Sequence, residues 1–221
     1  MSRLAGGLVV IAALLAGSPY SRAQSAGTAV EIGDDDGVEA MKSRIFAFVE
    51  ALTDYTADVR VREPELEAIL THYASLDGIH GEGDPGGILE RAFRDGRYDF
   101  GVIVNDPFYV SWCRGRSLEP EAFFRGLLRL EALRMREEGL ARLERARSEL
   151  PEQRAELESM REKVGGEAYR EGAAALEAAA EMVEETRELM GGLPRPSRDE
   201  ARLLQEHRER IEAVLGEDDL E

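Results

Sequence analysis

Two runs of apolar and small side chains, spaced by three or four residues, constrain the fold of this chain most strongly. One run contains a single glutamine and the other a single arginine; they are Leu143, Ala146, Leu150, Gln153, Leu157, Met160 and Val164, then Tyr169, Ala173, Leu176, Ala180, Val183, Arg187 and Met190. This spacing returns to one face of an α-helix and is typical of a coiled-coil seam. Gly165 and Gly166 separate the runs, and short connections make neighbouring helices antiparallel. Residues 117–216 are therefore expected to form long antiparallel, coiled-coil-like helices.

Pro151 lies inside the first of these runs. A proline in a helix interior removes one backbone hydrogen bond and costs ~3 kcal/mol, so the helix either bends there or ends and restarts. Because the register of the apolar residues continues past Pro151, the sequence favours collinear helical segments.

Polar residues and glycines indicate where the long helices begin and end. Ser117 is expected to cap the first helix, and Gly191 with Gly192 to end the second. Ser197 and Glu200 form a capping box, which predicts a last helix that presents Leu204, His207, Ile211, Val214 and Leu215. His207 interrupts this apolar face, so we interpret it as a histidine at the border of the core. Residues 217–221 are expected to be an acidic, frayed tail.

Residues 37–116 are predicted to be a compact, aromatic-rich helical region. A capping-box pair, Asp36 and Glu39, opens one amphipathic helix, and Pro64 opens a second. Two Asp-Pro pairs open short helices, one ending at Gly96 and one carrying Phe108, Tyr109 and Trp112. Residues 98–104 alternate in part like a strand, but no pairing partner is visible, so an extended packed segment is expected. The predicted fold class is all-α: an irregular helical bundle with the long helices at its C-terminal end.

Residues 1–23 have the features of an export signal peptide. Arg3 precedes an apolar run from residue 4 to residue 17, and Ser21-Arg22-Ala23 offers a cleavage site. Ser18 stands where a lipoprotein needs a lipid-bearing cysteine, and the apolar run is shorter than the ~20 residues that span a bilayer. We therefore expect a periplasmic or secreted protein with no stable membrane insertion after cleavage. Residues 24–36 are expected to be a flexible acidic lead.

The net charge argues against binding to nucleic acid or anionic membranes, and the cysteine content excludes an intramolecular disulfide. The chain has 28 lysines and arginines against 45 acids, a net charge of −17, which repels nucleic acid phosphates and anionic lipid headgroups. Cys113 is the only cysteine, so the chain forms no intramolecular disulfide. Beside Val110 and Trp112, it is expected to be a small buried residue.

A metal site is the sharpest chemical hypothesis that the sequence supports. Two histidines and three acids lie within thirteen residues: His72, Asp77, His80, Glu82 and Asp84. Imidazole and carboxylate groups are common metal ligands, although this spacing matches no known metal motif. The alternative is a chance cluster in an acidic chain.

A second candidate site is a ligand groove lined by aromatic residues: Phe100, Phe108, Tyr109, Trp112, Phe123 and Phe124. Aromatic-lined pockets bind small molecules. The alternative is that these side chains form the core that joins the compact region to the long helices.

The sequence contains no nucleophile elbow, HExxH, phosphate loop or haem-attachment motif. We therefore expect an exported, non-catalytic protein without a cofactor that acts through protein–protein interaction, as an envelope scaffold, adaptor or chaperone-like protein. Its partner would be another envelope protein or a second copy in a homodimer. A periplasmic small-molecule or metal-binding protein is the alternative, with its site in residues 72–84 or in the aromatic cluster of residues 100–124.

Overall fold

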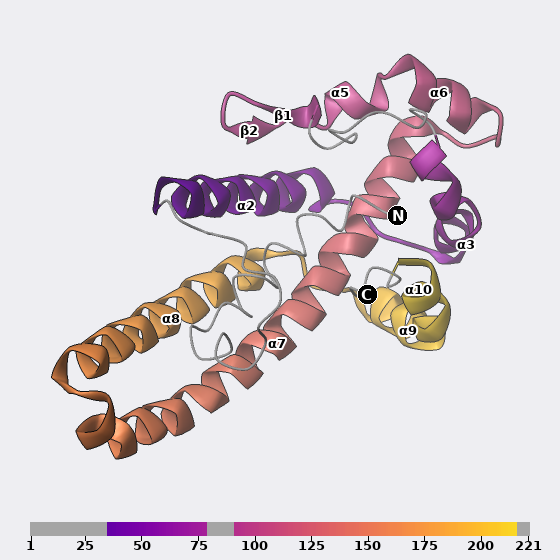
Figure 1. Cartoon of the computed structure of the whole chain (residues 1–221). Helices are drawn as coiled ribbons and strands as arrows, with labels where there is room; N and C mark the ends of the chain where they lie inside the picture. The colour runs from indigo at the N-terminus through magenta and orange to yellow at the C-terminus, as the bar shows by residue number, and fades with distance from the viewer. Residues whose placement is uncertain (1–34, 79–90, 216–221) are drawn as a thin grey trace.

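The computed structural model describes residues 35–78 and 91–215. The described part is almost entirely helical and contains one two-stranded sheet, so the predicted all-α fold class is confirmed (Figure 1). The predicted signal peptide (1–23), most of the acidic lead (24–36) and the acidic tail (217–221) lie outside the described residues.

The N-terminal part of the described chain contains two helices and a 3-10 turn. Helix α2 (Asp35–Thr56) begins within two residues of its predicted start, and α3 (Glu63–His72) has its proline in the first turn, as predicted. The 3-10 helix η2 (Tyr73–Gly78) continues from α3. Buried Val49 and Leu52 of α2, and Leu66 and Ile69 of α3, belong to the same core cluster.

The structure corrects the predicted helix that ends at Gly96. Phe93–Arg94 form strand β1, which pairs antiparallel with β2 (Arg97–Tyr98). Asp95 and Gly96 both have positive φ angles, 51° and 76°, as a two-residue hairpin turn requires. Gly96 therefore turns a hairpin and does not end a helix. Of the strand-like segment 98–104, only Tyr98 is in a strand, where it pairs with Phe93.

The expectation of an extended segment over residues 98–104 is also wrong. Gly101–Val104 form the short helix α5, because the Asp99 carboxylate accepts a hydrogen bond from the Gly101 N–H at 2.9 Å and turns the chain. Helix α6 (Pro107–Arg114) follows, and Asp106 caps it as predicted by accepting from the Phe108 and Tyr109 amides.

Helix α7 (Pro120–Val164) has 45 residues and is about 68 Å long at 1.5 Å per residue. It starts three residues after Ser117, which has a left-handed φ of 58° and so cannot adopt the extended conformation of an N-cap; Glu119 caps the helix instead. Pro151 lies inside the continuous helix, as the collinear interpretation expected. Gly165, with φ 83°, ends α7 as predicted.

Helix α8 (Gly166–Gly192) folds back along α7, and together they form the α7–α8 hairpin (Figure 1). The pairing is antiparallel: Gly139 lies beside Met190, and Leu157 lies beside Gly172. Leu143, Leu157, Leu176, Val183 and Met190 of the two predicted runs are buried. The predicted long antiparallel pair is thus confirmed.

The predicted last helix is two helices, α9 (Arg198–Glu206) and α10 (Arg208–Leu215), separated at His207. The capping box of Ser197 and Glu200 at the start of α9 is confirmed. At the break, the backbone of His207 (φ −109°, ψ 14°) leaves the helical conformation.

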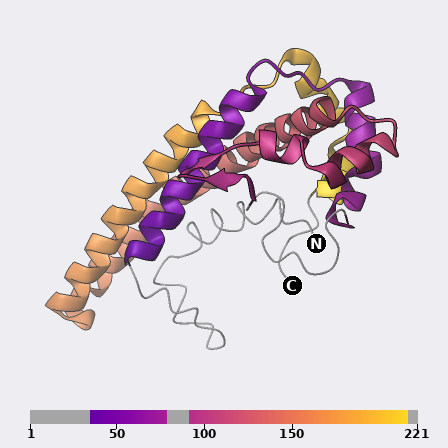
Figure 2. The same ribbon diagram turned by 90° about the horizontal axis from the view of Figure 1, so that it is seen from above.

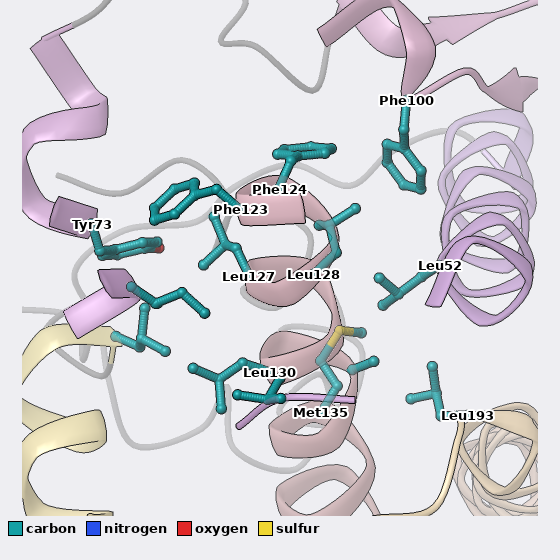
Figure 3. Close-up of a cluster of buried hydrophobic side chains, with 14 of the residues drawn as sticks. Leu52, Tyr73, Phe100, Phe123, Phe124, Leu127, Leu128, Leu130, Met135 and Leu193 are labelled. Atoms are coloured by element: carbon teal, nitrogen blue, oxygen red, sulfur yellow. The ribbon is translucent and has the colours of Figure 1, made fainter. Parts of the chain in front are cut away.

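The core surrounds the first third of α7. Figure 3 shows Leu127, Leu128 and Leu130 of α7 between Leu52 of α2 on one side and Tyr73 of η2 on the other. The hairpin extends away from this centre. Its tip lies farther from the core than the N-terminal end of α2, as Figure 1 and Figure 2 show. The core cluster contains residues from both predicted regions, and their division into 37–116 and 117–216 stays a prediction.

Candidate functional site

The predicted metal site lies mostly outside the described residues. His80, Glu82 and Asp84 are not described, and neither is the side chain of Asp77. His72 is half-buried at the end of α3, with its ring edge-on to Trp112 at a centroid distance of 6.3 Å. The site of residues 72–84 stays a prediction.

The aromatic residues of the predicted groove do come together. Ring centroids lie 6.0 Å apart for Phe100 and Phe124, 5.9 Å for Tyr109 and Phe124, and 5.6 Å for Trp112 and Phe123. Of the six groove residues, Phe100, Tyr109, Phe123 and Phe124 are buried and Trp112 is half-buried. The Tyr109 hydroxyl donates to the Pro120 carbonyl at 2.9 Å. Phe108, which the sequence places with them, is 67% exposed. The cluster joins α5 and α6 to α7; a role in ligand binding stays a prediction.

Cys113 is fully buried beside this cluster, as expected. Burial raises the pKa of its thiol. A raised pKa disfavours the thiolate that nucleophilic chemistry needs.

The distal part of the α7–α8 hairpin buries only a narrow strip of each helix. In α7, exposed charged residues such as Arg145, Glu152 and Glu156 surround the buried Leu143 and Leu157. Arg147 of α7 pairs with Glu184 of α8 at 3.1 Å across the outer edge of the seam. The hairpin therefore presents a long polar surface on both helices.

The surface of α8 is strongly acidic. The helix contains seven glutamates and two arginines. Glu177 and Glu181 are exposed and lie one turn apart on the same face, beside exposed Ala174 and Ala178, which precede them by three residues each. This face therefore combines negative charge with small apolar side chains.

Sequence reasoning missed the buried ion pair of Arg129 and Glu200. Both side chains are 1% exposed, and the two hydrogen bonds between them measure 3.0 Å each. Arg129 also donates to the Arg195 carbonyl, and Glu200 accepts from the amides of Ser197 and Val61. The pair thus joins α7, the α8–α9 connection and the segment before α3. The residues are 71 positions apart, and only the capping box indicated that Glu200 had a role.

Sequence reasoning also missed a cluster of possible metal ligands at the junction of α3 and α9–α10. One ligand atom from each of Glu63, Glu67 and His207 lies within 4.8 Å of the others. His207 Nε2 is 3.0 Å from a Glu63 carboxylate oxygen, and Arg210 forms a bidentate ion pair with Glu67. The spacing of Glu63 and Glu67 on one helix face was visible in the sequence, but nothing linked it to His207.

The fold and these sites define an all-α protein with a projecting helical hairpin. No protein family, curated protein or solved structure matches the chain. Within residues 35–78 and 91–215, no helix is both long enough and apolar enough to cross a membrane.

Proposed function

We propose that this chain is an exported, non-catalytic protein that acts through protein–protein interaction, with the α7–α8 hairpin as its interaction surface. The observation that carries the proposal is the shape and surface of the hairpin. It extends beyond the core, and its distal part is exposed and charged on both helices (Figure 1). A rigid projecting helix pair reaches a partner without disturbing the fold behind it.

The acidic face of α8 supports a partner with a basic docking surface. Opposite charges steer partners together and set the register of the complex. The chain would thus act as an envelope scaffold, adaptor or chaperone-like protein. Its partner would be another envelope protein or a second copy of this chain, which offers exposed arginines such as Arg145 and Arg154 of α7.

Site-specific photo-crosslinking in the native envelope tests the interaction surface. A photoreactive residue replaces Glu181 on α8 in one variant and Arg202 on α9, which is also exposed, in a control variant. We expect adducts of defined mass from position 181 and few from position 202, and the adduct mass separates a homodimer from another partner. Equal labelling at both positions, or none at 181, contradicts the proposal.

Export is tested separately by mass spectrometry of the protein recovered from outside the cytoplasm. Cleavage after Ala23 gives a mature chain that begins at Gln24. Recovery of the uncleaved chain in the cytoplasm contradicts this part of the proposal.

A further inference from the structure

The cluster of Glu63, Glu67 and His207 brings together groups from two distant parts of the chain. Glu63 and Glu67 lie one turn apart on α3, so their side chains project from the same face. His207 approaches them from the break between α9 and α10 and keeps 17% of its side chain exposed, while the two glutamates are about half exposed. The cluster is therefore open to solutes.

Hydrogen bonds define the state of each group in the present structure. Arg210 donates to both oxygens of Glu67, at 2.6 and 2.9 Å. Its guanidinium nitrogen also lies 3.2 Å from His207 Nδ1. Since arginine has only donors, Nδ1 accepts this bond, and Nε2 carries the proton that points to Glu63. Two carboxylates thus face one positive charge, and the cluster keeps an uncompensated negative charge.

We propose that Glu63, Glu67 and His207 form a binding site for a divalent transition metal ion of the zinc class, in which Arg210 is the competing intramolecular cation. One imidazole nitrogen with two carboxylates is a ligand set that Zn²⁺ accepts, whereas Ca²⁺ and Mg²⁺ prefer oxygen ligands alone. A divalent ion also neutralises the charge of both carboxylates, whereas Arg210 carries a single positive charge.

The proton balance explains why metal and Arg210 exclude each other. Coordination through Nε2 requires that the ring proton move from Nε2 to Nδ1: Nε2 loses one proton to solvent, Nδ1 takes one from solvent, and the ring is neutral before and after. A protonated Nδ1 cannot accept from Arg210, and Glu67 exchanges its two arginine bonds for the metal. Arg210, whose side chain is 51% exposed, turns out into solvent.

Isothermal titration of the full chain with Zn²⁺, repeated with Ca²⁺, tests this site. We expect one zinc ion bound per chain, a loss of that binding in His207→Gln, and about tenfold tighter binding in Arg210→Met, because the competing ion pair no longer occupies Glu67. Arg208→Met is the matched control, since Arg208 pairs with Glu212 on the same helix, away from the cluster; its affinity should equal the wild-type value. Ca²⁺ should not compete.

A second set of variants separates this site from residues 72–84 and guards against misfolding. His72→Gln should leave zinc binding unchanged. If His207→Gln does not give the wild-type circular dichroism spectrum, Glu67→Gln replaces it as the test variant. Glu67→Gln should also abolish zinc binding. Zinc binding that survives both His207→Gln and Glu67→Gln, or no zinc binding to a folded Arg210→Met chain, overturns the proposal.

Discussion

Glu200 has three structural roles at once: it completes the capping box of α9, accepts from the Val61 amide, and pairs with buried Arg129. Burial by itself would raise the pKa of Glu200, but the hydrogen bonds from Arg129, Ser197 and Val61 outweigh it and hold the pKa at about 2. The ionised form is therefore favoured in the fold. Its contribution to stability is full above pH 4.5 and is lost as the pH falls from 4.5 towards 2.

Replacing Glu200 by Gln should therefore destabilise the protein strongly at pH 7. The change leaves the Arg129 guanidinium buried without a counter-charge, which typically costs about 3–5 kcal/mol. Urea denaturation of both proteins measures this loss. The exposed Glu188→Gln is the control and should change stability by less than about 0.5 kcal/mol. A loss for Glu200→Gln as small as that of the control would show that the ion pair does not hold these segments together.

The contribution of Glu131 to the stability of the fold has the opposite pH dependence. It is 8% exposed on α7, and burial raises the pKa of its carboxyl to about 7, although Arg134, 3.6 Å away, lowers it. The folded chain therefore holds a proton that the unfolded chain releases, so stability falls as the pH rises from 4.5 through 7.

Glu131→Gln should remove this loss. We expect similar stability at pH 5 and a gain on the order of 2–3 kcal/mol at pH 8, since each unit of pKa shift corresponds to about 1.4 kcal/mol. Thermal or urea unfolding at the two pH values measures the difference. Glu149→Gln, at an exposed position of the same helix, is the control, because the charge of Glu138 itself raises the pKa of Glu131. An equal effect at both pH values would contradict the assignment to Glu131.

At the scale of the element, glycine sets the distance between α7 and α8. A Cβ atom at Gly172 would lie 3.0 Å from Leu157 Cδ1, closer than ordinary packing allows. Gly172→Val should therefore lower the stability of the hairpin by about 1–3 kcal/mol. Gly191, in the same helix, has open space around it, so Gly191→Val is the matched control. Hydrogen exchange of the α7–α8 amides locates the effect, and unchanged protection in Gly172→Val would contradict the close approach.

Local patterns predicted the long helices and the short, proline-initiated helices α3 and α6, but not the β1–β2 hairpin or α5. The two seams and the Gly165 break were predictable because their spacing repeats over many turns. The hairpin at Asp95–Gly96 was not, because an aspartate followed by glycine suits both a helix end and a two-residue turn. The choice depends on the β1–β2 hairpin, in which Tyr98 packs against Phe48 of α2. Such contacts, like the Arg129–Glu200 pair, join residues that no local pattern links.

At the scale of the whole molecule, the first third of α7 is part of the core and the remainder reaches outward with α8. Segments from both halves of the chain pack around Leu127, Leu128 and Leu130, while the distal hairpin is held mainly by its own seam. The residues that stabilise the fold therefore lie in a different part of the molecule from the surface that we propose for binding. Substitutions on the outer face of α8 should therefore change binding without changing the fold.

Reversing the charge of Glu177 and Glu181 tests this separation. The double variant Glu177→Arg with Glu181→Arg should lose partner capture, because it replaces the negative face of α8 with a positive one, while its unfolding midpoint stays near the wild-type value. Glu152→Arg with Glu156→Arg is the matched control, since these two exposed glutamates have the same spacing on α7. Pull-down from envelope extract measures capture. We expect the control to retain its partner; capture that persists in the α8 variant would place the interaction surface elsewhere on the molecule.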